Sequence, residues 1–448
     1  MSSSIRLKVG ILIFVYSFGY AAISPIFPQL LLTCFDGNDS KASSLNGVLW
    51  GLSNLLQFLL LPGLTALVDH VGSKILLLCS FGFGAVIFFI LTIFIENIIC
   101  VSVVFVLSGL TFVNIYIFNA MMGQTSTESK SVSHDFGIIT AILGLVLVIA
   151  PLLGTTLGTL DPRYVSGVSV LSNVIAFVFL LCCSWEDTSK TVDPLEKKTK
   201  LWSKIQPWKV LSIFFRHRQI LWLAFAYLFF DVSGGVINSL YILLDYRYGW
   251  SPVHVGVYIS VFGLATMLSQ TVLLRIFVPV KVSEMTALRC CLCFQCVGWI
   301  LQALSVKGWM FFLTILVVVP HLCFEPCMLG QLSQLVPKSE QGSLQGAVAS
   351  LRTLTMVVSE PMYGFVFSAC TSKAFKSKFG QALPSSPLLL ASLYSLIGFA
   401  AIFHASTQST PKTIPLDLES TADSLTTPLV GVPTSEVIPC SQSSAPDS

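Results

Sequence analysis

Charged residues are scarce in this sequence. Only 10% of its 448 residues are Asp, Glu, Lys or Arg, whereas 54% are hydrophobic and the mean hydropathy is +0.81. A soluble domain has about 25% charged residues, so this composition cannot form a surface that faces water. The net charge is +3, and the basic residues fall in loops between apolar runs. We therefore expect no nucleic-acid partner, because such a partner needs basic residues gathered on one soluble face.

Motifs of common enzymes are also missing. The sequence has no glycine-rich phosphate loop, no nucleophile elbow and no HExxH zinc motif. Of its 13 cysteines, Cys290, Cys291, Cys293 and Cys296 crowd into one short stretch. Four thiolates on one helix are poor tetrahedral ligands for zinc, so we interpret them as small apolar packing residues. We expect no enzymatic activity, no catalytic residue, no metal site and no cofactor.

Long apolar runs dominate the chain instead. A helix of about 20 apolar residues crosses the hydrocarbon core of a bilayer, and these runs are too long and too evenly apolar for barrel strands. The expected fold class is therefore an all-α membrane protein with twelve transmembrane helices. The predicted spans are 8–32, 45–67, 75–95, 98–120, 136–160, 164–184, 219–244, 252–276, 285–305, 308–333, 343–369 and 385–404.

One long polar stretch divides these spans into two groups of six. It runs from Trp185 to Arg218 and contains eight Lys or Arg against four acids, which is typical of a cytoplasmic linker. The end of the chain is rich in Ser, Thr and Pro and has no hydrophobic periodicity, so we expect it to be disordered. The predicted organisation is an N-terminal lobe at 1–184, a basic linker at 185–218, a C-terminal lobe at 219–404 and a cytoplasmic tail at 405–448.

The positions of Lys and Arg predict the orientation. With the amino terminus in the cytoplasm, 17 of the 25 basic residues lie on the cytoplasmic side, 7 lie on the opposite side and Arg352 lies within a span. Because basic residues prefer the cytoplasmic side, we expect both termini in the cytoplasm, although the last outer loop, with three Lys, opposes the trend. Plasma membrane and endomembrane are both compatible with this pattern. A glycosylation sequon, Asn38-Asp39-Ser40, falls in the first outer loop.

Five ionisable side chains fall inside the predicted spans. They are Asp231, His321, Glu325, Arg352 and Glu360. A lone charge at the bilayer centre costs at least about 2.5–3.5 kcal/mol, so these side chains should face a cavity or one another. His321 and Glu325 are four residues apart, so a regular helix puts them on one face, where they could share a proton. Arg352 could pair with Asp231 or Glu325, or meet an anionic group of a solute. A proton or substrate role and a purely structural ion pair are both open for each residue.

Uncharged amides within the spans form a second set of candidates. They suit a cavity for a hydroxylated or zwitterionic solute, and the alternative is that they join helices by hydrogen bonds. The candidates are Asn54, Gln57, Asn114, Asn119, Asn238 and Gln270.

Two short motifs carry a resemblance to a known family. The segment TALVDHVGSK, residues 65–74, resembles the helix 2–3 signature of the major facilitator superfamily through Asp69, Gly72 and Lys74. The resemblance implies a gating loop, in which Asp69 belongs to a cytoplasmic latch between the lobes. The segment FGIITAILGLVLVIAPLLGTTLG, residues 136–158, resembles the helix 5 motif of drug:proton antiporters. The matching residues are Gly137, Pro151, Gly154 and Gly158, with Ala150 in place of a Gly.

A third motif narrows the resemblance to one branch of that superfamily. The segment EQGSLQGAVASLRTLTMVVSEPMYGFVF, residues 340–367, resembles tetracycline-resistance antiporters and the hippocampus-abundant-transcript group. The resemblance implies two six-helix lobes around a central cavity that opens alternately to each side. It also marks departures, because that group tends to have an acid where Val15 stands, and Glu325 and Glu360 replace an apolar residue or Gly.

The predicted function is that of a secondary active transporter. The solute would be a small organic molecule, moved by alternating access, with H+ as a candidate coupling ion. Two alternatives are a uniporter that uses no proton and a transporter-fold receptor or trafficking protein that moves no solute. The expected partners are the solute and the lipid bilayer, and we expect a monomer.

Overall fold

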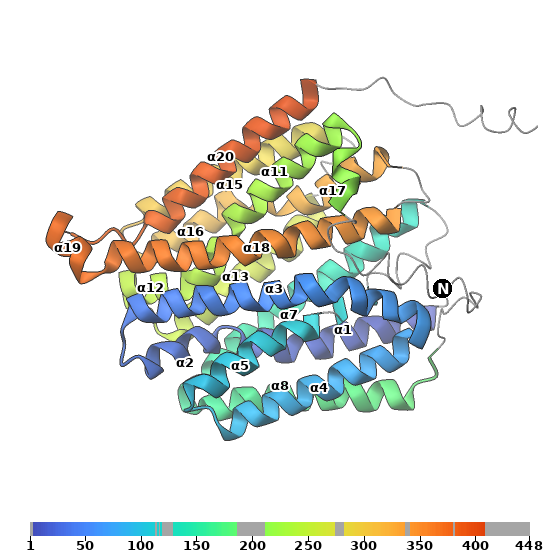
Figure 1. Ribbon diagram of the computed structural model, residues 1–448, viewed down its shortest axis with the longest axis horizontal. Coiled ribbons are helices and arrows are strands. Elements are labelled where there is room, and N and C mark those ends of the chain that lie inside the picture. Colours follow the sequence, from blue (N-terminus) through green and yellow to red (C-terminus); the bar gives the residue numbers. More distant parts are fainter. Residues whose placement is uncertain are drawn as a thin grey trace, which may run out of the picture. The chain divides into compact units, whose positions relative to one another are not determined.

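The chain folds into packed helices (Figure 1). The computed structural model describes residues 3–112, 114–115, 117–118, 129–185, 211–273, 282–336, 341–379 and 381–407, and in these residues it has no β-strand. Residues 1–408 form one compact unit. Most of the basic linker, from residue 186 to residue 210, and the tail from residue 408 onward lie outside the described residues. The lobe and linker boundaries therefore stay predictions.

The N-terminal half, residues 1–184, contains seven α-helices in its described part. They are α1 (Ser3–Ile23), α2 (Ile26–Cys34), α3 (Asp39–Val71), α4 (Ser73–Ile93), α5 (Ile98–Ser108), α7 (Ser129–Leu160) and α8 (Pro162–Cys182). A break at Pro25 separates α1 from α2 within one predicted span, because proline cannot donate a backbone hydrogen bond. Side-chain caps start two helices: Asn97 accepts from the backbone of Ile99 at 2.9 Å, and Asp161 accepts from that of Arg163 at 2.8 Å.

The C-terminal half, residues 218–407, has more interrupted helices. They are α11 (Arg218–Gly234), α12 (Leu240–Tyr248), α13 (Pro252–Leu268), α15 (Glu284–Leu304), α16 (Gly308–Val318), α17 (Phe324–Gln334), α18 (Gln341–Thr371), α19 (Lys373–Phe379) and α20 (Ser386–Thr407). Short 3-10 turns at Gly235–Ser239 and Val319–Cys323 join α11 to α12 and α16 to α17. Each of these pairs forms one span with a changed helical twist at its middle.

The helices agree with the predicted spans. Nine helices in the described residues are long and apolar enough to cross a membrane, and the other three predicted spans correspond to α3, α5 and α18. Large apolar side chains such as Phe89, Leu171 and Leu316 are exposed, as lipid contact requires. The last helix, α20, continues to Thr407, three residues past the predicted end of the last span at 404.

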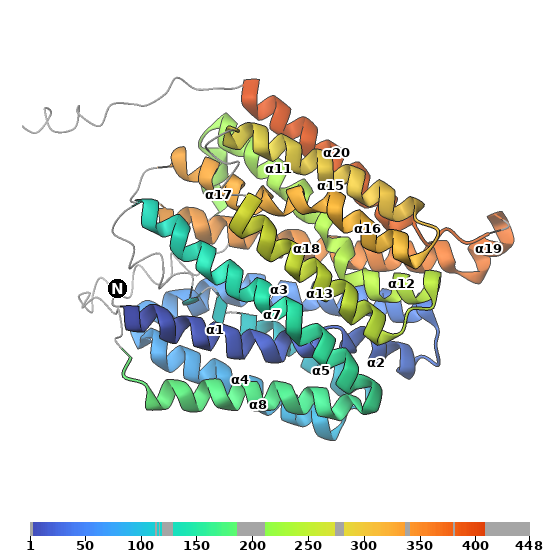
Figure 2. The same cartoon turned by 180° about the vertical axis from the view of Figure 1, so that it is seen from behind.

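Two long contacts join the halves. The helix α3 packs along α18, and α7 packs along α13, while α1, α4, α7 and α8 pack together within one half and α11, α15 and α20 within the other. Both views show α3 beside α18 and α7 beside α13 (Figures 1 and 2). The candidate site lies along the first of these contacts.

Candidate functional site

The contact between α3 and α18 is close enough for backbones to touch. A Cβ atom added at Gly47 would lie 2.7 Å from the carbonyl oxygen of Glu360, and one at Gly364 would lie 2.6 Å from that of Ser43. Farther along, the hydroxyls of Ser40 and Ser368 are hydrogen-bonded at 2.7 Å. Small residues therefore bring α18 against α3 and place the Glu360 side chain at the boundary between the two halves.

Three helical spans meet at the Glu360 carboxyl group. Its Oε1 accepts a hydrogen bond from Nδ2 of Asn238 at 2.7 Å. The backbone oxygen of Asn238 in turn accepts from Nδ2 of Asn46, in α3, at 3.0 Å. Asn238 lies in the 3-10 turn between α11 and α12, where the changed twist directs its side chain to α18. The cluster Asn46–Asn238–Glu360 thus contains one residue of the N-terminal half and two of the C-terminal half.

The Glu360 carboxyl group has no positive partner in the described part of the chain. The residue is 3% exposed, and its Oε2 has no hydrogen-bond partner. No described Lys, Arg or His forms an ion pair with it, and the ionisable residue whose electrostatic interaction reaches it is Tyr20 of α1. Burial without a cation disfavours the charged form of a carboxyl group. This position is therefore suited to a proton or to the cationic group of a ligand.

A second cluster lies nearer the N-terminal end of α18 and is more exposed than the Glu360 cluster. Arg352 donates to Oε1 of Glu325 at 2.9 Å, with side chains 45% and 44% exposed. This pairing is one of the two considered from the sequence. Asp231 is 3% exposed, its Oδ2 has no hydrogen-bond partner, and the charges of Arg352 and Glu325 both act on it. One cation thus faces two acids, and its half-exposed position leaves it accessible to a solute.

The structure does not bring His321 and Glu325 together. The 3-10 turn at Val319–Cys323 contains His321 and ends before Glu325, so the regular spacing of four residues on one face does not apply. Nδ1 of His321 lies 2.6 Å from the carbonyl oxygen of Val318, and its ring lies beside Phe230. The expected shared proton between the two residues is therefore not supported, and Glu325 pairs with Arg352 instead.

The predicted amides have different surroundings. Asn54 donates to the carbonyl oxygen of Trp50 at 2.9 Å within its own helix, and Gln270 donates to that of Leu322 at 3.1 Å, which joins two spans. Gln57 is 6% exposed. Asn114 is fully buried and both polar atoms of its amide lack a partner, which is rare for a buried amide. Asn119 lies outside the described residues.

The described residues include only part of the two family motifs. Gly72 has a φ of 93°, which favours glycine, and Nζ of Lys74 donates to the carbonyl oxygen of Cys183 at 3.3 Å, within the N-terminal half. The side chain of Asp69 lies outside the described residues, so its latch role stays a prediction. Pro151 lies inside α7, and a Cβ atom at Gly154 would overlap the backbone of Ala22. The surroundings of Gly137 lie outside the described residues.

The sequence analysis missed two residues of the Glu360 cluster. Asn46 is the second residue of the predicted span 45–67, and Tyr20 lies in an apolar run. Asn46 is buried and Tyr20 is partly buried beside the cluster. Their polarity within a span was the only available signal. Without the pairing of α3 with α18, nothing connected them to Glu360.

Comparisons with known proteins agree on the superfamily. Residues 9–359 match the Major Facilitator Superfamily. The chain is 24% identical over 397 residues to the class H tetracycline resistance protein of Pasteurella multocida, covering 88% of this chain and 95% of that protein. It is also 24% identical over 331 residues to the human hippocampus abundant transcript 1 protein, covering 72% and 66%.

Transporters are among the solved structures that share this fold. The human organic anion transporter MFSD10 (TETRAN) superposes with a TM-score of 0.68 at 16% identity, covering 90% of this chain and all of that chain. The nucleoside transporter NupG gives a TM-score of 0.65 at 13% identity, covering 91% and 99%. At these identities the likeness concerns the fold alone.

Proposed function

The chain belongs to the Major Facilitator Superfamily and is a secondary transporter of a small organic solute, and we propose that Glu360 couples this transport to the movement of protons. The observation that carries the proposal is the burial of this carboxyl group, without a cation, at the contact between the two halves. A proton on Glu360 removes the cost of its charge while the α3–α18 contact is closed.

Alternating access gives this proton two environments. The surroundings of Glu360 come from both halves, since Asn238 follows α11 and Gly47 of α3 lies against the backbone carbonyl oxygen of Glu360. When one half rotates against the other, α3 leaves α18 and water reaches the carboxyl group. The proton can then dissociate, and the contact closes again only after a proton, or a cationic solute group, has returned.

The cluster of Asp231, Glu325 and Arg352 is suited to solute binding. Arg352 is half-exposed, and its guanidinium group can form two parallel hydrogen bonds with a carboxylate or phosphate. A solute with an anionic group would compete with Glu325 for Arg352. The amides Asn114, Gln57 and Asn54 are the proposed polar contacts on the other half.

We propose a topology for the same transporter. The distribution of 17 against 7 basic residues supports cytoplasmic termini, two lobes separated by a cytoplasmic linker at 185–218, and a gating loop at Asp69, Gly72 and Lys74. The contact of Ser40 with Ser368 then lies on the outer side. We also propose that the protein acts as a monomer and has no enzymatic activity.

The test is transport by the full-length protein in proteoliposomes. Uptake and efflux of a mixed metabolite panel are measured with equal pH on both sides and with a gradient of one unit in each direction. One pH unit is worth about 1.4 kcal/mol, which supports about tenfold accumulation per coupled proton. We expect this accumulation with the wild type and with Glu96→Gln, a control at an exposed acid.

The Glu360→Gln variant separates coupling from transport. Glutamine keeps an oxygen that can accept from Asn238 but cannot release a proton, so we expect solute exchange to continue without gradient-driven accumulation. Loss of accumulation in Glu325→Gln but not in Glu360→Gln would move the proton site to the second cluster. Wild-type flux that ignores the pH gradient would overturn proton coupling and indicate a uniporter.

A further inference from the structure

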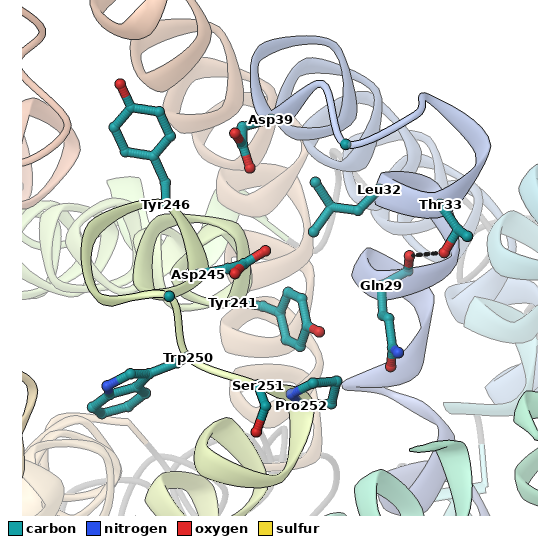
Figure 3. Close-up of a pocket in the computed structure, with 12 residues that line it drawn as sticks. Gln29, Leu32, Thr33, Asp39, Tyr241, Asp245, Tyr246, Trp250, Ser251 and Pro252 are labelled. Carbon is teal, nitrogen blue, oxygen red and sulfur yellow. Dashed lines mark hydrogen bonds between the residues drawn. The ribbon is translucent and has the colours of Figure 1, made fainter. Parts of the chain in front are cut away.

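A separate cavity of about 590 Å³ lies away from both clusters, at the ends of α2, α3 and α12. Its lining includes Gln29 and Asp39 from the N-terminal half, and Tyr241, Asp245 and Tyr246 from the C-terminal half. Figure 3 shows both carboxyl groups and the Tyr241 ring in this cavity. A ligand bound here would contact both halves.

The side chains of this cavity favour positive charge. Asp39 lies before the predicted span 45–67, and its pKa is raised, first by burial and then by the charge of Asp245, while Lys376 lowers it. Two acids therefore share one site. Lys376, in α19, has its Nζ 5.5 Å from the ring centre of Tyr246, so a cation of the chain itself already lies at the edge of this region.

A tyrosine that lines the cavity has an accessible hydroxyl. Tyr241 is 7% exposed, lines the cavity, and makes no hydrogen bond within the described part of the chain. A tyrosine hydroxyl can accept a hydrogen bond as well as donate one. This hydroxyl is therefore available to accept a hydrogen bond from a ligand in the cavity.

We infer that this cavity is a second ligand site, which binds a small primary alkylammonium ion between the two halves. The carboxylates of Asp39 and Asp245 neutralise the charge, the tyrosine rings contact the ammonium and its alkyl chain, and the Tyr241 hydroxyl accepts one N–H. The aromatic lining distinguishes the site from one for an inorganic cation, which prefers oxygen ligands.

Occupancy of this site affects transport through the conformational equilibrium. The lining residues of the two halves are together while the Ser40–Ser368 contact is closed, so a bound cation stabilises this closed state. Saturating cation should therefore slow solute exchange. This kinetic consequence rests on the proposed alternating access, whereas binding itself does not.

Binding is tested by calorimetric titration of the full-length protein in nanodiscs with propylammonium chloride, at constant ionic strength. We expect saturable binding that weakens about tenfold or more in Asp245→Asn or Asp39→Asn. Tyr241→Phe should weaken propylammonium binding by about three- to fivefold but leave tetramethylammonium, which has no N–H, unchanged. Lys376→Gln should strengthen binding by about threefold, and Lys373→Gln, an exposed change on the same short helix, should have no effect.

Several results would overturn the inference. Absence of saturable propylammonium binding would do so, as would equal affinity in the wild type and in Asp245→Asn. Calcium chloride binding that propylammonium cannot displace would indicate an inorganic cation site instead. Because calorimetry requires no transport, normal binding in a protein with no gradient-driven flux would reject the proton coupling and leave this site intact.

Discussion

The two contacts that join the halves are built alike and differ in charge. In the α7–α13 contact, a Cβ atom at Gly263 would lie 2.7 Å from Cβ of Leu147, and one at Gly144 would lie 3.1 Å from Cβ of Met267. In the α3–α18 contact, Gly47 and Gly364 allow an equally close approach. Helices in lipid have no hydrophobic driving force to associate, so both contacts depend on the tight packing that glycine allows.

Only the α3–α18 contact has a buried carboxyl group among its described residues. Glu360, Asn46, Ser40 and Ser43 lie on it, whereas the described part of the α7–α13 contact is uncharged and includes Thr155, whose hydroxyl donates to the carbonyl oxygen of Pro151 within its own helix. Protonation can thus change the energy of one contact and leave the other unchanged. This asymmetry would let α7–α13 serve as a constant pivot while α3–α18 opens and closes.

The largest expected effect comes from adding volume to the charged contact. Gly47→Ala places a methyl group 2.7 Å from the Glu360 carbonyl oxygen, so the helices must separate. We expect overpacking to cost about 1–3 kcal/mol and to reduce transport at least about tenfold. The measurement is solute uptake together with thermal stability in detergent.

Gly63→Ala is the matched control on the same helix, because a Cβ atom there meets nothing within 4 Å. Gly263→Ala tests the other contact by the same steric argument and should also reduce uptake. Normal uptake by Gly47→Ala would show that the closed α3–α18 contact is not part of the transport cycle.

The second-largest expected effect distinguishes the α3–α18 contact, which contains a carboxyl group, from the uncharged α7–α13 contact. Glu360→Gln should abolish the pH dependence of solute exchange, whereas Thr155→Val, a polar change on the uncharged contact, should leave it unaltered. The reason is that Glu360 can exchange a proton and Thr155 cannot. The measurement is exchange at equal pH on both sides, across about pH 5.5 to 8, the range in which a buried carboxyl group can titrate. A pH profile for Glu360→Gln that matches the wild type would assign the titrating group elsewhere.

A smaller effect is expected at the second cluster, which lies nearer the N-terminal end of α18. The Glu325–Arg352 pair is half-exposed, so Glu325→Gln should lower the free energy of unfolding by about 1 kcal/mol or less. Arg352→Gln should cost more, about 3 kcal/mol, because it also leaves buried Asp231 without a nearby cation. Thermal unfolding of the two variants in detergent compares them. Equal losses would show that Asp231 does not depend on Arg352.

The smallest effect concerns the cavity at the helix ends. The raised pKa of Asp39 means that it takes up a proton at a higher pH than an ordinary aspartate, whose pKa is about 3.9. Propylammonium binding should be complete at neutral pH and weaken as the pH falls through that raised value, with Asp245 and Lys376 as the charged groups that set it. Calorimetry at neutral pH and at two more acidic values measures the trend, and stronger binding at low pH would contradict it.

Much of the architecture followed from composition. Runs of about 20 apolar residues can satisfy their backbone in lipid only as helices, which is why each predicted span corresponds to a described helix. The helices α3 and α7 begin six and seven residues before the predicted spans 45–67 and 136–160. The pairing of Arg352 with Glu325 was one of two candidates, since few groups in a membrane interior can neutralise a buried charge. The family motifs indicated the superfamily to which the chain belongs.

Side-chain partners within the spans were predicted less well. The geometry of His321 and Glu325 assumed a regular α-helix, and the 3-10 turn at Val319–Cys323 removed that regularity. Asn46 joins the cluster only because α3 lies against α18, and its hydrogen bond to Asn238, 192 residues away, has no local signal in the sequence. Asp39 and Asp245 likewise gave no sign of sharing a cavity.

The sequence by itself thus determined that this protein lies in a bilayer as helices and that its few internal charges need partners. Both conclusions depend on transfer free energies, which are properties of single residues and local runs. Only the tertiary structure decided which of two glycine-packed contacts carries Glu360 and which acids meet at the helix ends. Those arrangements depend on the packing of helices that are distant in the chain, and the energy of a buried carboxyl group is set by the neighbours that this packing supplies.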